Sequence, residues 1–267
     1  MANDQQGMLT HRLPEQEAMN IVQATVESQK GVFRDWHVTN WTAHAERYRA
    51  DLRLVTSLGD AAAILEVGSA PCHMTALLHL SGHSVVGVDR APGRVADFIE
   101  QMNLDVRECD IERAPLPFAD GRFLGVLLCE TFEHLRVDPA FVISEINRVL
   151  APGGFLLLTT PNVYSLPSLA RHLTGRSIAD PLTEFGKLRG LGHMGHVREY
   201  SSREVIRFVQ AFGLAVQSVG YRYHESKRGR RERILGLAYK VVPRRFHRDI
   251  VLIARKTSDG PCLAVLP

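Results

Sequence analysis

Between residues 63 and 160 the chain alternates short aliphatic runs with amphipathic stretches, and this alternation limits its fold more than any other feature. The runs with the composition of buried strands are AILEV (63–67), SVVGV (84–88), LDVR (104–107), FLGVLLC (123–129) and FLLLTT (155–160). The helical stretches between them are TALLHLSG, RVADFIEQM and DPAFVISEINRVL. Almost wholly apolar strands that alternate with helices predict an α/β fold, with a mainly parallel, doubly wound sheet covered on both faces.

Residues that typically begin or end helices support these boundaries. Asp138 and Pro139 are typical of a helix start, and Ala151-Pro152-Gly153-Gly154 predicts that this helix stops. Further along, SSREVIRFVQAF predicts a helix capped by Ser201 or Ser202 and ended by Gly213. Two final strands are predicted in LAVQSVGYRY (214–223) and DIVLIARK (249–256).

The remaining segments set the expected domain organisation. Residues 1–59 predict a helical cap, EQEAMNIVQATVESQ and TAHAERYRADLRLVTSLG, whose helices are joined by the aromatic-rich GVFRDWHVTNW. Residues 60–267 form the main domain, with an irregular insertion at about 161–200. We expect a single structural unit.

Composition places the chain among ordinary globular proteins, with 45% hydrophobic and 23% charged residues. It has no apolar run of about 18 residues, and its first residues lack the pattern of a secretory signal. The four cysteines show neither paired nor zinc-binding spacing. These features predict reduced thiols and a cytoplasmic location.

Acidic residues follow four consecutive predicted strands. They are Glu66, Asp89, Asp110 and Glu130. Because the carboxyl ends of parallel strands meet at one sheet edge, these side chains should lie together where ligands of doubly wound sheets bind. An acid about 20 residues beyond the first loop can accept hydrogen bonds from ribose hydroxyls, which suits Asp89. The pattern predicts a polar, cationic ligand.

The loop EVGSAPC after the first strand departs from the glycine-rich loops that hold phosphates. Gly68 is present, but Ala70 and Cys72 replace two expected glycines, and Pro71 has no backbone N–H. A phosphate site needs backbone donors and close approach. The sequence therefore predicts a cofactor loop that is not a phosphate cradle.

Together EVGSAP, the Asp89 after the second strand, CDIERAPLPFADGRFLGVLLCETFEHL and RVLAPGGFLLLTTPN resemble class I S-adenosylmethionine-dependent methyltransferases. The resemblance covers about residues 60–215 and the closing hairpin. It implies a Rossmann-like, seven-stranded sheet whose last strand is antiparallel, with S-adenosylmethionine as cofactor and S-adenosylhomocysteine as product. The stretch GHVREYSSREVIRFVQAFGLAV also resembles the branch that methylates oxygens of small molecules, quinones and sugars.

The resemblance also implies a cofactor site. Glu66 and Gly68 would lie by the methionine portion, Asp89 by the ribose, and Asp110 with Ile111 by the adenine. The full set of expected cofactor-binding residues is Glu66, Gly68, Ser69, Ala70, Asp89, Arg90, Asp110, Ile111, Cys129 and Glu130.

Methyl transfer to an aliphatic hydroxyl requires a base or a metal, because the hydroxyl is a poor nucleophile while it keeps its proton. His134 is the leading candidate base, with Glu133 beside it, and His193 and His196 lie in a glycine-rich loop expected to return over the same edge. The alternative roles are a helix-start residue for His134 and a surface loop for the other two histidines. Their spacing matches no metal motif, so we assign no metal.

Three aromatic residues, Trp36, Trp41 and Tyr164, are candidates for a substrate-stacking wall. Sugars present apolar C–H faces to such rings, but the tryptophans could equally pin the N-terminal helices to the core.

Net charge is +3, yet residues 222–256 carry a local excess of basic residues. This stretch is interpreted as a solvated connector and hairpin; alternatively, residues 227–248 form a basic amphipathic helix that touches an anionic membrane or a lipid-linked substrate. Nucleic-acid binding is not expected, because no RNA-binding module is recognisable.

The leading functional hypothesis is an O-methyltransferase of a small hydroxylated acceptor, preferably a saccharide and including oligosaccharides. One alternative is methylation of a quinone or lipid-borne phenol at a membrane surface; another is an inactive scaffold that keeps the fold. The sequence predicts no oligomeric state.

Overall fold

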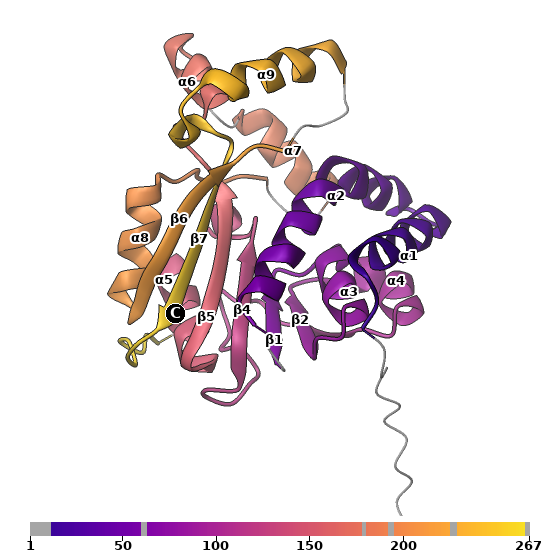
Figure 1. Cartoon of the computed structure of the whole chain (residues 1–267), viewed down its shortest axis with the longest axis vertical. Coiled ribbons are helices and arrows are strands. Elements are labelled where there is room, and N and C mark those ends of the chain that lie inside the picture. Colours follow the sequence, from indigo (N-terminus) through magenta and orange to yellow (C-terminus); the bar gives the residue numbers. More distant parts are fainter. Residues whose placement is uncertain (1–11, 60–62, 178–179, 192–194, 225–228, 265–267) are drawn as a thin grey trace, which may run out of the picture.

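The computed structural model describes residues 12–59, 63–177, 180–191, 195–224 and 229–264. Its centre is a seven-stranded sheet in the order β3-β2-β1-β4-β5-β7-β6 (Figure 1). The strands are β1 (Ile64–Val67), β2 (Val85–Asp89), β3 (Asp105–Glu108), β4 (Phe123–Cys129), β5 (Leu150–Pro161), β6 (Leu214–Arg222) and β7 (Asp249–Lys256). β1 to β5 pair in parallel, and β7 runs antiparallel to both neighbours, as predicted.

Helices cover both faces of this sheet. They are α1 (Glu15–Ser28), α2 (Arg34–Ser57), α3 (His73–Leu80), α4 (Ala96–Gln101), α5 (Pro139–Val149), α6 (Leu166–Leu173), α7 (Pro181–Leu191), α8 (Ser202–Ala211) and α9 (Gly229–Val241). One hydrophobic cluster joins the sheet to α5 and α8, and a second joins it to α1, α2, α3 and α4. α6, α7 and α9 lie beyond one end of the sheet, at the top of Figure 1.

The strand period explains the two clusters. Along β5, Leu156 and Leu158 belong to the first cluster, whereas Phe155 and Leu157 belong to the second. Successive side chains of a strand point to opposite faces, so a strand buried on both sides must be apolar at nearly every position. This is why these runs read as continuous rather than alternating.

The predicted helix starts are observed. The Asp138 carboxylate accepts hydrogen bonds from the N–H groups of Ala140 and Phe141, with Pro139 in the first turn. Ser201 forms a reciprocal capping box with Glu204 at the start of α8. Each cap satisfies backbone donors that the first helical turn leaves unpaired.

Three predicted boundaries are wrong. The aromatic joint at 31–41 is largely the first part of α2, which begins at Arg34. The segment 161–200 is not irregular, because it contains α6 and α7. β5 begins at Leu150, so the turn signal at 151–154 ends α5 but lies within the strand. In α2 and β5, packing against the sheet and the pairing of neighbouring strands outweigh local propensity.

The basic stretch is also more ordered than a solvated connector. Residues 229–241 form α9, and some of the basic side chains of the stretch join the sheet to helices that cover it. Arg222 pairs with Asp51, and the buried Lys256 ammonium donates to the carbonyl of Asn147. The local charge excess therefore does not form one exposed surface. In the part of the chain that the structure describes, no helix combines the length and apolarity needed to cross a membrane.

Candidate active site

A cavity of about 780 Å³ opens at the carboxyl ends of β1, β2 and β4, where the strand order reverses. This is the position at which doubly wound sheets bind ligands, and the volume suits a small-molecule site. All the residues predicted to bind the cofactor line it, namely Glu66, Gly68, Ser69, Ala70, Asp89, Arg90, Asp110, Ile111, Cys129 and Glu130. The acids that follow four consecutive strands therefore do gather in one place.

The loop after β1 is held against β2. The N–H groups of Gly68 and Ser69 donate to the carbonyl of Val88 at 2.9 and 3.0 Å, and that of Ala70 donates to the Asp89 carboxylate at 3.2 Å. These three donors are used within the protein, and Pro71 has none, so the loop lacks the free N–H groups of a phosphate cradle. Cys72 adopts the left-handed conformation at φ 65°, which glycine would adopt without strain.

Gly68 is required by close approach of the chain. Its φ is +74°, and a Cβ at this position would lie 2.4 Å from the Thr131 hydroxyl oxygen. Thr131 belongs to the loop after β4, so the missing side chain lets the loops after β1 and β4 meet at the cavity.

The acids are more fully paired than the sequence suggested. Asp89 accepts a hydrogen bond from the N–H of Ala91 at 2.9 Å and lies 3.3 Å from the Arg94 guanidinium. Glu130 pairs with Arg47 of α2 at 3.0 Å. The cavity edge is therefore an array of fixed carboxylates with balancing arginines rather than a purely acidic surface.

Glu66 differs, because its carboxyl is buried and bonded to the Thr75 hydroxyl. Burial raises the pKa of Glu66 to about 8, against smaller opposing effects of Thr75 and Arg47. A cation brought into the cavity would favour the ionised form. Fixed carboxylates for hydroxyl groups, a buried carboxyl for positive charge and a loop without phosphate donors fit a cationic nucleoside such as S-adenosylmethionine.

Sequence reasoning named Trp36 of α2 but missed the other residues that this helix contributes. Arg47, Tyr48 and Asp51 line the cavity from this helix, and Asp51 forms a buried two-pronged ion pair with Arg222 of β6. The signal was present, because Arg47 and Asp51 are four residues apart on the helix and next to the buried Tyr48 and Leu52. Charged residues on a buried helical face need partners, and here the partners are Glu130, directly after β4, and Arg222 of β6.

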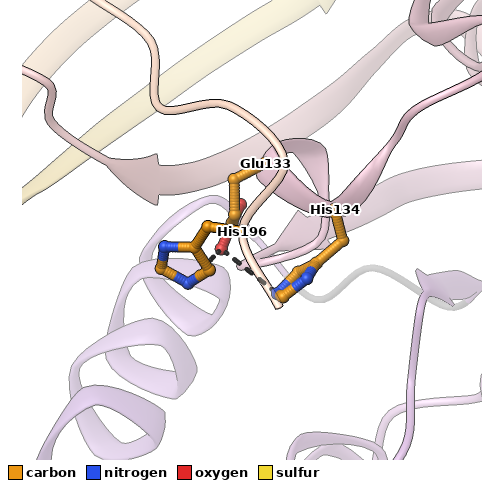
Figure 2. A group of neighbouring side chains, drawn as sticks. All are labelled: Glu133, His134 and His196. Carbon is orange, nitrogen blue, oxygen red and sulfur yellow. Dashed lines mark ion pairs between the residues drawn. The ribbon is translucent and has the colours of Figure 1, made fainter. Parts of the chain in front are cut away.

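Figure 2 shows the second group of the cavity, in which Glu133, His134 and His196 converge. Glu133 and His134 lie in a short 3₁₀ turn, Phe132–His134, directly after β4. His196 comes from the segment after α7. Hydrogen bonds join the two segments: the N–H of Val197 donates to the carbonyl of Glu133 at 2.8 Å, and Nδ1 of His134 lies 2.9 Å from the carbonyl oxygen of Gly195.

The three side chains of this cluster lie close together, but Oε1 of Glu133 is too far from either histidine for a direct hydrogen bond. Oε1 of Glu133 lies 3.8 Å from Nε2 of His134 and 3.9 Å from Nε2 of His196. The Glu133 side chain is fully buried; its Oε2 accepts from the Thr160 hydroxyl, whereas Oε1 has no hydrogen-bond partner. Burial lowers the pKa of His196, but the carboxylates of Glu199 and Glu133 outweigh burial and raise it overall.

Of the other predicted residues, His193 lies outside the described residues. Trp36 lines the cavity, with the Arg94 guanidinium over its ring. Trp41 is in the core, 5% exposed, stacked on Tyr48 and edge-on to His73, so it does not face a substrate. Tyr164 is 56% exposed and is not among the lining residues. The expected wall of three aromatic rings is therefore not formed.

Comparison with known proteins agrees with this geometry. Residues 65–158 match a family described as methyltransferase domain. A protein of Mycolicibacterium smegmatis named "Probable S-adenosylmethionine-dependent methyltransferase" is 28% identical over 155 residues, which are 58% of this chain and 52% of that protein. The chain thus spans about half the length of this curated relative.

Solved structures share the fold. A SAM-dependent methyltransferase from Archaeoglobus fulgidus superposes with a TM-score of 0.58 at 17% identity, covering 83% of this chain and 99% of that one. The 1,6-didemethyltoxoflavin-N1-methyltransferase of Burkholderia thailandensis, solved with S-adenosylhomocysteine, superposes with a TM-score of 0.54 at 19% identity, covering 92% and 91%. Residues 65–158 therefore match a methyltransferase domain, and the chain is similar in sequence and in strand order to class I S-adenosylmethionine-dependent methyltransferases.

Proposed function

We propose that this protein transfers the methyl group of S-adenosylmethionine to a hydroxyl oxygen of a small acceptor, with a saccharide as the preferred class. The observation that carries the proposal is the cluster of Glu133, His134 and His196, which lines the same cavity as the acids of the cofactor edge. One end of the cavity suits the cationic nucleoside, and the other offers groups that can activate a hydroxyl.

When bound, S-adenosylmethionine supplies an electrophilic methyl carbon on a positively charged sulfur. Asp89 is positioned to accept hydrogen bonds from ribose hydroxyls, because backbone N–H groups hold its carboxylate at the end of β2. The Glu66 carboxyl, in its ionised form, would balance the positive charge of the sulfur. Their shared role is to fix the donor in one orientation, which matters because in-line displacement depends on alignment.

His134 is the proposed proton acceptor. Its Nδ1 faces the carbonyl of Gly195, which only accepts hydrogen bonds, so the ring proton of neutral His134 lies on Nδ1. Nε2 is then left with its lone pair, and the side chain is 35% exposed at the cavity. An unprotonated imidazole nitrogen beside the acceptor is the arrangement that general-base catalysis needs.

A hydroxyl-rich acceptor is supported by the lining beyond this cluster. Ser165, Ser168 and Arg171 of α6 and its N-cap, together with Lys187 of α7, line the cavity. These side chains offer donors and acceptors suited to sugar hydroxyls. Apart from the histidines, Trp36 and the largely buried Tyr48 are the aromatic residues among the described residues that line the cavity.

The cofactor assignment is tested by calorimetry. S-adenosylhomocysteine should bind and raise the melting temperature, whereas NAD and ATP should do neither, because the loop after β1 has no free phosphate donors. Absence of S-adenosylhomocysteine binding would support an inactive scaffold. The acceptor is sought by incubating cell extract with methyl-labelled S-adenosylmethionine and identifying the labelled product by mass spectrometry.

His134→Ala tests the base. Turnover should fall by roughly 100-fold, while the affinity for S-adenosylhomocysteine is retained. Unchanged turnover would remove His134 from this role. His172→Ala, on the exposed face of α6, is the matched control and should leave both quantities unaltered.

A second acceptor class, a quinone or lipid-borne phenol, is favoured by a specific observation. Large apolar side chains are exposed on all three helices beyond the end of the sheet: Leu173 on α6, Leu182 and Phe185 on α7, and Leu237 and Val241 on α9. Basic residues Arg244 and Arg245 are exposed just after α9. Apolar side chains flanked by basic residues suit an anionic membrane surface.

Liposome flotation separates the two acceptor classes. Binding to anionic vesicles that is lost in a Leu237→Ser/Val241→Ser variant would favour the lipid-borne acceptor. Val32→Ser is the control, because Val32 is 95% exposed and lies in the connection between α1 and α2, outside these helices. Absence of vesicle binding would favour the saccharide.

A further inference from the structure

We propose that Glu133, His134 and His196 bind one divalent transition-metal ion at the cavity wall. Their ligand atoms, one from each side chain, all lie within 4.8 Å of one another (Figure 2). The sequence predicts these residues at one sheet edge but indicates no metal, because His196 is 62 residues beyond His134 and the spacing matches no metal motif. The tertiary structure brings the three side chains together.

The separations fit an ion better than direct pairing. Charge-assisted N–H···O bonds are about 2.8 Å long, whereas Oε1 of Glu133 is 3.8 and 3.9 Å from the two Nε2 atoms. A tetrahedral ion with bonds of about 2.1 Å holds its ligand atoms about 3.4 Å apart. The two histidines are 35% and 39% exposed, so their rings have room to move toward a common ion.

The hydrogen-bond partners of the rings orient both Nε2 atoms toward this common point. Nδ1 of His134 lies 2.9 Å from the carbonyl oxygen of Gly195, and Nδ1 of His196 lies 3.5 Å from Oε1 of Glu199. Metal-binding histidines are held in this way, with the distal ring nitrogen donating to a carbonyl or carboxylate. Ser168 in turn donates to the other oxygen of Glu199.

Counting hydrogen atoms distinguishes an ion from a water molecule. In the neutral form in which histidine binds a metal, with both rings protonated at Nδ1, the point between the side chains faces three acceptors, namely two Nε2 lone pairs and Oε1 of Glu133. Water has only two hydrogen atoms and would leave one acceptor unsatisfied, whereas a cation satisfies all three. Oε1 of Glu133 is buried and has no hydrogen-bond partner, so it is the atom for which such a ligand matters most.

The donor set indicates the class of metal. Two imidazoles and one carboxylate suit first-row transition ions, whereas Mg²⁺ and Ca²⁺ prefer oxygen ligands throughout. Three protein ligands at a cavity wall also leave positions open toward the cavity. With Nε2 of His134 bound to the ion, His134 would no longer be the proton acceptor, and the ion itself would activate the acceptor hydroxyl by polarising its oxygen and lowering its pKa. The proposal thus rests on the proposed function and changes the role of His134 within it, although the binding itself can be measured without cofactor or acceptor.

The test uses the full chain, stripped of metal with a chelator and titrated with Mn²⁺ while free Mn²⁺ is followed by EPR. We expect saturation at one ion per chain, with Mg²⁺ a poor competitor. His134→Ala and His196→Ala should each weaken binding by roughly 100-fold, and Glu199→Gln by roughly tenfold through loss of the bond that orients His196. His44→Ala is the control, since His44 lines the same cavity outside the cluster and should leave binding unchanged.

A second measurement does not depend on variants. Pulsed EPR of the Mn²⁺-loaded protein should detect two imidazole nitrogens. Detection of no imidazole nitrogen, tighter binding of Mg²⁺ than of Mn²⁺, or Mn²⁺ binding that survives both histidine substitutions would each overturn the proposal. Because none of these readouts requires turnover, failure of the metal site and failure of the methyltransferase assignment are distinguishable.

Discussion

The two halves of the cavity are built differently. The cofactor half consists of the ends of β1, β2 and β4 and the loops that follow them, whose positions are fixed by parallel register such as Glu66 opposite Gly87 and Leu127. The acceptor half combines the turn after β4 with α6, α7 and the segment after α7. Strand ends can be placed from sequence because pairing repeats regularly, whereas the second half depends on a few hydrogen bonds between distant segments.

The largest expected effect concerns the link between α2 and the far strands of the sheet. Arg222→Met leaves the carboxylate of Asp51, which is 1% exposed, without its partner, and should lower the free energy of unfolding by about 3–5 kcal/mol. Urea denaturation measures the loss. The double variant Asp51→Asn/Arg222→Met should recover part of it, and Arg53→Ala, which breaks an exposed pair with Glu15, should change little. A small effect of Arg222→Met would show that this link contributes little.

Glu133→Gln should separate the two halves by activity. The substitution removes the negative charge between His134 and His196, so turnover should fall by roughly 100-fold or more. The affinity for S-adenosylhomocysteine should change by less than about threefold, which is under 1 kcal/mol. Activity assays measure the turnover and calorimetry measures the affinity for S-adenosylhomocysteine, with the melting temperature as a check on folding. Equal losses in both would contradict a division of labour between the halves.

Asp89→Ala should show the opposite pattern, with affinity for S-adenosylhomocysteine reduced by roughly 10-fold to 100-fold because the acceptor of ribose hydrogen bonds is removed. Calorimetry measures the dissociation constant. Glu108→Ala is the matched control: Glu108 pairs with Asp89 in the β2–β3 register but is exposed and outside the cavity lining. If Glu108→Ala weakened binding as much, Asp89 would have no special role.

The last expected effect is a pH dependence in the cofactor half. Burial raises the pKa of Glu66 from 4.5 to about 8, so the folded state holds a proton that the unfolded state has released between these values. This contribution to stability is complete below about pH 4.5 and is lost as pH rises through 8, at up to about 1.4 kcal/mol per pH unit. Urea denaturation of the cofactor-free protein at pH 6 and pH 8 should show the loss in the wild type. In Glu66→Gln it should be smaller, and equal slopes in both proteins would refute the cause.

Much of the cofactor half was predictable, for a physical reason. Buried parallel strands are continuous apolar runs, and an acid directly after such a run has to lie at the sheet edge, as Asp89 and Glu130 do. The helix caps at Asp138 and Ser201 were equally predictable, because backbone donors at a helix start need a nearby acceptor. Local chemistry and strand period were sufficient in these cases.

The acceptor half could not be placed in this way. The loop that carries His196 was expected at this edge, but no local pattern specifies which of its side chains meets Glu133. Nor does any local pattern specify that Arg47 and Asp51 of α2 find partners in Glu130 and Arg222. Trp41 and Tyr164 show the same difficulty. Both were candidates for substrate stacking, but the sequence did not indicate that Trp41 lies in the core and Tyr164 at the surface.

The sequence by itself determined which segments form the strands, which carboxylates lie at the cofactor edge, and that the loop after β1 lacks phosphate donors. Each of these depends on neighbours along the chain. Only the tertiary structure decided which charges are paired and that Glu133, His134 and His196 converge. Such convergence depends on contacts between residues some 60 positions apart, whose geometry is set by packing of the whole domain rather than by any local preference.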